Sequence, residues 1–259
     1  MTRGLVLAPT QAVRAIKVGL CGVSMKLAEY PRHFPVLEVQ QTFYEPPTVA
    51  TMTRWKATLP LRFEFTIKAW QLITHSALTS STYRRLRRPL TAEERASTGG
   101  FRNSPIVDEG WATTVECARQ LRASSILFQC PASFKPTPAN VDAMAGFFHR
   151  IQRPANVRLM WEPRGPWPEE LVTQICSEHD LVHVVDPFVN RALTSAPTYW
   201  RLHGITGARH VYSDAELAQL IQKLPADGDV YVMFNNMPRV GDAQRFVKLL
   251  AGVSAQVAV

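Results

Sequence analysis

Eight short runs of aliphatic, β-branched and aromatic residues recur along the sequence, and longer amphipathic stretches separate most of them. The short runs are typical of buried strands, and the amphipathic stretches are typical of helices that pack on a sheet. The expected strands are Lys17–Val23, Val36–Phe43, Arg62–Trp70, Ser125–Cys130, Val157–Glu162, Leu181–Asp186, Thr198–Gly204 and Asp229–Asn236. The expected helices are Thr48–Thr58, Glu109–Leu121, Ala139–Ile151, Glu169–His179, Asp214–Lys223 and Asp242–Leu250.

This alternation predicts an α/β protein with a parallel sheet and crossover helices. Eight strands in about 250 residues favour a closed (β/α)8 barrel of the TIM type. A doubly wound open sheet usually has a glycine-rich phosphate turn after its first strand, but the turn here, "LCGVSMKL", lacks that pattern. We therefore expect a single barrel domain over residues 1–259, with a core from about 17 to 251.

Two connections depart from the regular pattern. The first is a long insertion after the third strand, residues 76–107, which includes the arginine-rich stretch "YRRLRRPLTAEERASTGGFRNSP". It leaves from the strand ends where barrels keep their active sites, so it is either a lid or binding loop, or a disordered surface insertion. The second is "PFVNRALTSAP", which predicts a missing or reduced helix between the sixth and seventh strands.

The charge balance favours acidic partners. The chain has 29 basic and 21 acidic residues, a net charge of +8, which suits small anions or nucleic acid but says nothing about the fold. The four cysteines form no CxxC pair. The apolar run near the N-terminus is too short for a signal peptide, and no apolar stretch is long enough to span a membrane. We expect a cytoplasmic protein, and the sequence indicates neither a cofactor nor an oligomeric state.

Polar residues occupy positions on these strands that would point into the barrel. Barrel interiors are usually layers of Val, Ile and Leu. Here the inward parity carries Glu38, Gln40, Thr42, Glu64, Thr66, Lys68, Gln129, Glu162, Arg201 and His203, and the last strand ends in Asn235 and Asn236. Buried charges must pair, so two carboxylates, Glu38 and Glu162, are expected to face the two cations Lys68 and Arg201. This arrangement suits a structural ion-pair network or a ligand pocket, and the two are not exclusive.

Six ordered blocks, "LEVQQTFY", "FTIKAWQLITH", "LFQCPASF", "WEPRGPW", "YWRLHG" and "VYVMFNN", resemble the YecE-like family, domain of unknown function seventy-two. The resemblance covers roughly Val18 to Leu250 and implies a TIM barrel without an established activity. The recurrent polar positions of the family fall on Glu38, Thr42, Tyr44, Lys68, His75, Gln129, Glu162, Arg164, Arg201, His203 and Asn236. This chain departs from the family in lacking a Trp after its first strand and in having Gln40, Ala132 and a shortened stretch after Glu162, all at the expected pocket rim.

Specific roles follow from residue chemistry. We expect His203 to act as general acid or base, and Glu162 as a base or metal ligand. Arg164 and Arg201 suit a carboxylate or phosphate. The other expected ligand-binding residues are Glu38, Tyr44, Lys68, His75, Gln129, Asn235 and Asn236. Alternatively, His203 is a satisfied core histidine, His75 caps a loop and Asn236 caps the last helix.

A metal site is not expected. Glu38, Glu162, Asp186 and His203 could supply ligands, but the cations Lys68 and Arg201 in the same bowl oppose a metal ion electrostatically. Cys21 and Cys130 end strands, yet neither has a neighbour in sequence that would activate a thiol.

These observations predict a barrel that binds a small anionic ligand at the carboxyl ends of its strands, as a hydrolase or isomerase with acid/base chemistry. A nucleic-acid-binding or nuclease-like barrel is the alternative, since Arg84, Arg85, Arg87 and Arg88 could contact phosphates. A third possibility is a non-catalytic scaffold with a structural polar core.

Overall fold

The computed structural model describes residues 15–257 and shows eight parallel strands that close into a barrel in the order β1 to β8. The last strand, β8, pairs with β1, which confirms the expected barrel. The short apolar run near the N-terminus lies outside the described residues. The strands are β1 (Ile16–Cys21), β2 (Val36–Val39), β3 (Glu64–Lys68), β4 (Ser125–Gln129), β5 (Arg158–Glu162), β6 (Leu181–Val185), β7 (Thr198–Leu202) and β8 (Val230–Phe234).

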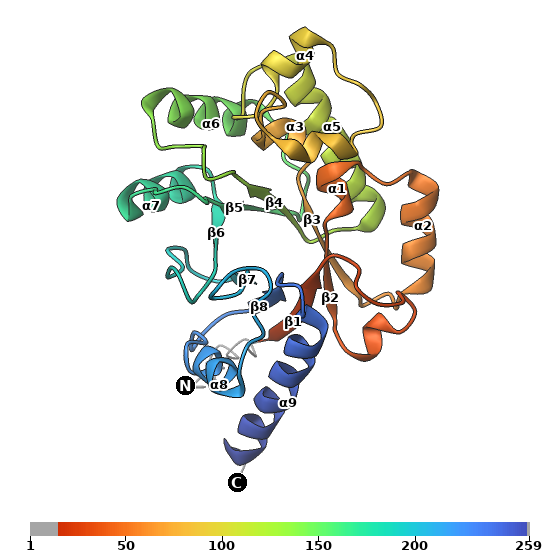
Figure 1. Ribbon diagram of the computed structural model, residues 1–259, viewed down its shortest axis with the longest axis vertical. Helices are drawn as coiled ribbons and strands as arrows, with labels where there is room; N and C mark the ends of the chain where they lie inside the picture. The colour runs from red at the N-terminus through yellow and green to blue at the C-terminus, as the bar shows by residue number, and fades with distance from the viewer. Residues whose placement is uncertain (1–14, 258–259) are drawn as a thin grey trace, which may run out of the picture.

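Helices surround the strands on most sides of the barrel, as Figure 1 shows. The longer helices are α2 (Val49–Thr58), α5 (Pro105–Leu121), α6 (Pro138–Arg150), α7 (Glu169–Glu178), α8 (Asp214–Gln222) and α9 (Arg239–Val257). All six expected helices are present. Three of them begin with a side-chain cap: the side chains of Thr48, Thr137 and Ser213 accept hydrogen bonds from the first turns of α2, α6 and α8. Helix α5 begins at Pro105 and α9 extends to Val257, so both are longer than expected.

The second strand is shorter than expected. It ends at Val39, and residues 41–44 form the short helix α1 (Gln41–Tyr44). The Thr42 hydroxyl lies 2.9 Å from the Val39 carbonyl and 2.7 Å from the Lys68 carbonyl, and donating to them ties this turn to the rim. The expectation that Gln40 and Thr42 point inward from a strand is therefore wrong.

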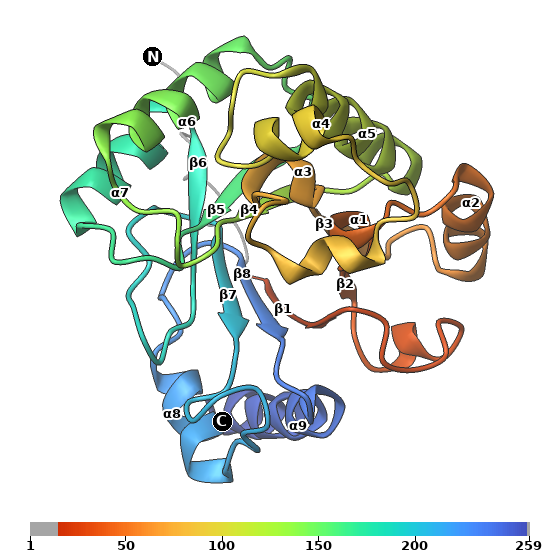
Figure 2. The same ribbon diagram turned by 45° about the horizontal axis from the view of Figure 1, so that its top comes forward.

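The 76–107 insertion is folded rather than disordered. It contains the 3-10 helix η2 (Ser81–Arg85), the helix α4 (Ala92–Ser97) and the start of α5. Thr91 and Glu94 form a capping box at the start of α4, and the Tyr83 hydroxyl donates to the His75 carbonyl at 2.7 Å. Figure 2 shows α1 and α3 (Gln71–Thr74) close to β3, with α4 next to α5. A further 3-10 helix, η1 (Tyr30–Arg32), precedes β2.

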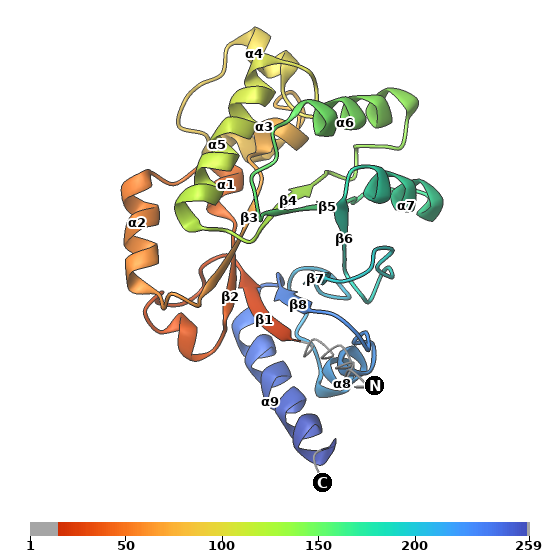
Figure 3. The same ribbon diagram turned by 180° about the vertical axis from the view of Figure 1, so that it is seen from behind.

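No helix links β6 to β7, as predicted. Residues 186–197 form turns and irregular backbone, which Figure 3 shows as a loop beside β7. The outer side of β7 is therefore covered by a loop where other strands have a helix.

Side chains alternate between the barrel interior and the helix layer. On β7, Trp200 and Leu202 belong to the apolar core around the barrel, while Tyr199 belongs to a separate cluster inside it. That inner cluster, which includes Val36, Leu127 and Met160, forms an apolar plug. Polar side chains lie above the plug at the carboxyl ends of the strands. None of the described helices is long and apolar enough to cross a membrane.

Candidate active site at the mouth of the barrel

The centre of the polar mouth is Arg201, which is completely buried and held by two carboxylates. Its Nη2 lies 2.9 Å from Glu38 Oε1, and its Nη1 forms an ion pair with Glu162 Oε2. Burial alone would lower the pKa of Arg201, but Glu162 and Glu38 outweigh it and raise that pKa well above its usual value. The predicted network of Glu38, Glu162 and Arg201 therefore exists, and the guanidinium is turned into it rather than toward a ligand.

Glu38 accepts hydrogen bonds from three side chains, Tyr199 and Arg201 of β7 and Gln40 just after β2. The Tyr199 hydroxyl donates to Glu38 Oε2 at 2.8 Å and lies 2.9 Å from the Thr66 hydroxyl. The Gln40 amide donates to the other carboxylate oxygen, which also binds Arg201. Glu38 is 0% exposed, so its position fits a fixed counter-ion for Arg201 rather than a ligand-binding group.

Glu162, at the end of β5, links Arg201 to the groups nearer the surface. Its Oε1 accepts hydrogen bonds from Arg164 Nη1 at 2.8 Å and from His203 Nε2 at 2.9 Å. Burial would raise the pKa of Glu162, but Arg201, His203 and Arg164 hold it well below its usual value. A carboxylate with this many donors and so low a pKa is a poor proton acceptor, so the geometry does not favour the predicted role of general base.

The hydrogen bonds of His203 define which ring nitrogen can take up a proton. The Asn235 amide nitrogen lies 3.0 Å from Nδ1 and can only donate a hydrogen bond, so Nδ1 is the acceptor. The ring proton is therefore on Nε2, which donates a hydrogen bond to Glu162. The backbone N–H of His203 donates to Asp186 Oδ2 at 2.9 Å. Gly204 follows with a φ of +90°, where a Cβ atom would lie 2.2 Å from the Gly207 carbonyl oxygen. The chain thus turns sharply away and leaves the imidazole, 19% exposed, at the mouth.

Lys68 and His75 lie on the β3 side of the mouth, and both contact the Phe43 ring. Lys68 Nζ is 3.5 Å from the ring centroid, and the His75 ring centroid is 4.8 Å from it. Burial, and then the charge of Lys68, lower the pKa of His75 to about 3, and Thr74 Oγ1 holds its Nδ1 at 2.8 Å. His75 is therefore a neutral packed group at the end of α3 and is unsuited to proton transfer near neutral pH.

Two small cavities open at the mouth. The acid/base cavity, about 200 Å³, is lined by Glu162, Arg164, His183, Asp186 and His203 among others. The cationic cavity, about 290 Å³, is lined by Cys21, Gly22, Val23, Gln40, Gln41, Tyr44, Arg85, Asn235 and Arg239. The hydrogen bond between His203 and Asn235 joins the two walls. No acidic side chain of the described residues lines the cationic cavity.

Two arginines of the cationic cavity lie outside the strands, at the end of η2 and at the start of α9. Neither was among the predicted ligand-binding residues of the mouth, although the nucleic-acid alternative named Arg85 as a phosphate contact. Arg85, from the insertion, lies over the Tyr44 ring with its guanidinium carbon 4.2 Å from the centroid. Arg239, at the start of α9, donates from Nε to the Ser24 hydroxyl and from Nη1 to the Asn236 carbonyl at 3.4 Å. Strand parity could not reveal either residue, because each reaches the mouth from outside the sheet.

Two predicted ligand-binding residues lie elsewhere or remain unengaged. Asn236 is completely buried, and its amide donates to the His210 carbonyl at 2.9 Å and to Asp242 Oδ2 at 2.6 Å. It therefore positions the first turn of α9, the alternative already given for it. Gln129 lies opposite Glu162 in the β4–β5 register and makes no side-chain hydrogen bond within residues 15–257. It is partly exposed and points toward the mouth.

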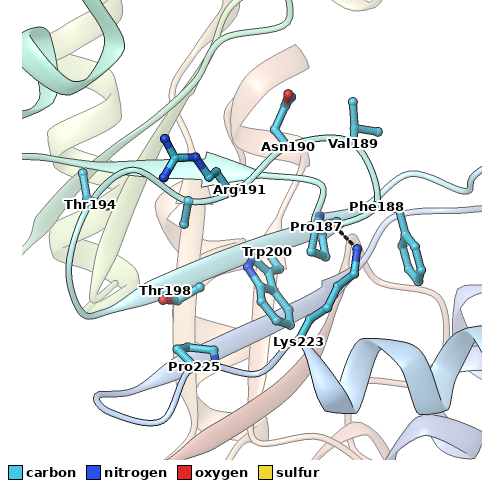
Figure 4. A pocket seen from close by; sticks show the side chains of 11 residues that line it. Pro187, Phe188, Val189, Asn190, Arg191, Thr194, Thr198, Trp200, Lys223 and Pro225 are labelled. Carbon is cyan, nitrogen blue, oxygen red and sulfur yellow. Dashed lines mark hydrogen bonds between the residues drawn. The ribbon is translucent and has the colours of Figure 1, made fainter. Parts of the chain in front are cut away.

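A third cavity, about 590 Å³, lies on the outer side of β7 where the helix is missing. Figure 4 shows Trp200, Thr198 and Lys223 in its wall, with Lys223 bonded to the Pro187 carbonyl. Trp200 and Arg201 point to opposite faces of β7, so this cavity does not communicate with the polar mouth through the strand. Its cations are engaged, since Arg191 pairs with Glu169. We therefore place the candidate site at the mouth.

Within residues 15–257, no group of three or more His, Cys, Asp or Glu side chains gathers in a way that could hold a metal ion. The four cysteines are buried and unpaired. Burial raises the pKa of Cys21 and Cys130, and that of Cys130 reaches about 12. Neither thiol is activated as a nucleophile.

Comparison with known proteins identifies a family and agrees with the barrel fold. The family described as "Protein of unknown function DUF72" matches residues 20–257. The chain belongs to the DUF72 family. A crystal structure of a DUF72 protein from Enterococcus faecalis V583 superposes on the fold with a TM-score of 0.67 at 22% identity, covering 92% of this chain and 98% of that chain.

More distant barrels share the fold of this DUF72 protein. A D-tagatose 3-epimerase-like protein has a TM-score of 0.55 at 10% identity, covering 94% of this chain and 100% of its own. A family 2 AP endonuclease from Brucella melitensis has a TM-score of 0.52 at 9% identity, covering 93% and 99%. A search of curated proteins gave no match. At these identities the superpositions establish the barrel fold of this DUF72 chain and nothing finer.

Proposed function

We propose that this DUF72 protein binds a small molecule with a phosphate or carboxylate group at the mouth of the barrel and acts on it by proton transfer through His203. The observation that carries the proposal is the cationic cavity. Arg85 and Arg239 line it without an acidic neighbour, and it adjoins the His203–Glu162 pair. An anion there would meet positive charge that the protein itself leaves uncompensated.

The hydrogen bonds support a division of labour at the mouth. Glu162 accepts a hydrogen bond from the Nε2–H group of His203. When His203 takes up a proton at Nδ1, the carboxylate therefore stabilises the imidazolium that forms. The Asn235 amide donates a hydrogen bond to Nδ1 of His203, and Asn235 also lines the cationic cavity. A ligand bound in this cavity would replace Asn235 as the hydrogen-bond partner of Nδ1. Glu162 acts as the positioning group and His203 carries the proton, which suits isomerisation or hydrolysis.

Thermal unfolding with and without pyrophosphate tests the binding step. A ligand at about 100 times its Kd stabilises the folded state by about 2.7 kcal/mol, which raises the melting temperature. We expect Arg85→Met and Arg239→Met to reduce the shift strongly and His203→Gln to keep it. Arg62→Met is the matched control, because Arg62 and Arg32 line a cavity of about 270 Å³ formed by segments that precede β2 and β3.

Two outcomes would contradict this function. A wild-type melting temperature that does not respond to pyrophosphate would leave a non-catalytic scaffold as the better account. A shift that survives in both Arg85→Met and Arg239→Met but disappears in Arg62→Met would place the anion away from the mouth.

Nucleic-acid binding is the second candidate, and the insertion favours it. Arg84 and Arg87 are exposed and form no side-chain ion pair within the described chain, whereas Arg88 is bound by Glu94 and Glu109. If they contact phosphates, DNA or RNA binding should weaken steeply with salt. Arg84→Ala and Arg87→Ala should each reduce the salt slope by about one, and Arg88→Ala should reduce it less. No binding at low salt would reject this candidate.

A further inference from the structure

Of the four buried charged residues at the mouth, Glu38, Lys68, Glu162 and Arg201, Lys68 is the one without a counter-ion among the described residues. It is the last residue of β3 and is 5% exposed. Its Nζ has no carboxylate within 4.0 Å and makes no hydrogen bond within residues 15–257; its neighbour is the face of Phe43. Although Nζ has no hydrogen-bond partner in this part of the chain, it is not completely closed off from solvent. Packing against Phe43 therefore holds the Lys68 nitrogen in place, and the nitrogen makes no hydrogen bond to the described residues.

Arg201 explains why Lys68 lacks a partner. It binds both Glu38 and Glu162, the carboxylates predicted to face Lys68. Burial, and then the charge of Arg201, lower the pKa of Lys68 to about 7, against the opposing pull of Glu162 and Glu38. A large fraction of this amine is therefore uncharged near neutral pH and carries a free lone pair, which makes it a nucleophile.

We propose that Lys68 forms a covalent imine with the carbonyl carbon of a small anionic aldehyde or ketone bound at the mouth. This inference rests on the proposed anion-binding function and names its substrate class. The anionic group would lie toward Arg85 and Arg239, and the carbonyl toward Phe43 and Lys68.

The chemistry needs no oxidant or reductant. The Nζ lone pair attacks the carbonyl carbon, the C=O π electrons move to oxygen, and a proton passes from nitrogen to oxygen to give a carbinolamine. The oxygen then leaves as water, with its second proton supplied through His203, and the C=N bond forms. A protonated imine withdraws electrons from the neighbouring carbon, so it would promote the proton transfers of an isomerisation.

Several charged or titratable groups face Lys68 from the surrounding elements. They are Cys21 on β1, Glu38 on β2, Glu162 on β5, Arg201 on β7 and His75 after α3. Burial raises the pKa of Cys21 and lowers that of His75, so these two remain uncharged near neutral pH. The state of the Lys68 amine then depends mainly on the balance between Arg201 and the two carboxylates.

Reductive trapping of the full-length wild-type protein tests the proposal. Glyoxylate, a small anionic aldehyde, is added with cyanoborohydride at neutral pH, and the modified lysines are located by peptide mass mapping. Because each unit of pKa changes the free-amine fraction about tenfold, we expect Lys68 to be modified at least about tenfold faster than Lys26, whose side chain is 85% exposed. Modification at Lys68 should saturate with glyoxylate and be slowed by pyrophosphate.

Variants identify the reacting nitrogen. Lys68→Arg keeps a cation but should abolish the fast adduct, and Lys26→Met should leave that adduct unchanged. If Lys68→Arg does not fold, the wild-type peptide map alone still decides the question. Modification of Lys68 no faster than that of Lys26 would overturn the imine proposal. The pyrophosphate melting shift separates the two proposals, because its persistence would show that anion binding stands while imine formation fails.

Discussion

The barrel holds two ionic clusters that are built from similar residues and used differently. The floor cluster, Lys17, Glu64 and Tyr231, lies at the amino ends of the strands. Lys17 Nζ is 2.7 Å from Glu64 Oε2 and 3.1 Å from the Tyr231 hydroxyl, which itself donates to Glu64 Oε1 at 2.7 Å. The mouth cluster is Lys68, Glu162, Arg201 and His203, and no carboxylate of the described residues pairs with Lys68.

The difference is the basis on which we propose a ligand site at the mouth and a structural network at the floor. In the floor cluster the three polar groups satisfy one another, so nothing there calls for a ligand. In the mouth cluster Arg201 binds both carboxylates, so the Lys68 amine has no carboxylate partner among the described residues. His203 lines one of the two mouth cavities, and Arg85 and Arg239 line the other. Buried charge is therefore compatible with either role, and what decides between them is which groups remain unsatisfied.

The largest expected effect is on stability and comes from Arg201. Arg201→Met removes the partner of two buried carboxylates, so we expect the free energy of unfolding to fall by about 3–5 kcal/mol in urea denaturation. The matched control is Arg164→Met, whose side chain is 38% exposed and which should cost less than about 1 kcal/mol. Equal losses in the two variants would show that Arg201 is no more important to the network than a rim residue.

The two lysines should respond to pH in opposite ways. Lys17 has a raised pKa, because the Glu64 and Tyr231 interactions outweigh its burial, so its stabilisation is complete below pH 10.5 and is lost at higher pH. Lys17→Met should therefore cost about 1–3 kcal/mol near neutral pH. Lys68 has a lowered pKa, so the unfolded state binds more protons between about pH 7 and 10.5, and wild-type stability gains from Lys68 as pH rises through that window.

Lys68→Met should accordingly be more stable than wild type below about pH 7, and its advantage should shrink toward pH 10.5. Urea denaturation of both variants across this range measures the two slopes. A Lys68→Met variant that is destabilised by the same amount at every pH would indicate that Lys68 is an ordinary packed cation.

A smaller effect is expected from Glu64 at the floor. Burial would raise its pKa, but Lys17, Ser124 and Tyr231 lower it, so its stabilisation is present above about pH 4.5 and is lost as pH falls. Glu64→Gln should cost about 1 kcal/mol at neutral pH and approach wild-type stability in acid. The pyrophosphate shift should remain unchanged, and losing it would link the floor to the ligand site.

The sequence predicted the barrel well because its evidence is local and repeated. The alternation of short apolar runs with amphipathic stretches identified all eight strands and six of the helices, and strand parity placed Glu38, Lys68, Glu162 and Arg201 in one interior. Parity failed at Gln40 and Thr42, because the strand ends at Val39 and a helical turn follows. The alternation of side chains along a strand does not predict the residue at which the strand ends and a turn begins.

The partners within the site could not be predicted in the same way. Strand parity predicted that two cations and two carboxylates point into the barrel, but it did not predict which of them pair. The pairing depends on how far each side chain reaches across the barrel. Arg201 reaches both Glu38 and Glu162, so Lys68 is left without a counter-ion. Arg85 and Arg239 come from an insertion and a helix start, and their meeting at the mouth is a consequence of tertiary structure.

The most direct test of the contrast between floor and mouth is an NMR titration of the protein labelled with carbon-13 in its lysines, with and without pyrophosphate. A single series of spectra reports both clusters. We predict that Lys68 titrates near pH 7 and that pyrophosphate raises this midpoint, while Lys17 titrates above pH 10.5 and does not respond. A Lys68 that titrates together with the exposed lysines and ignores pyrophosphate would contradict the account.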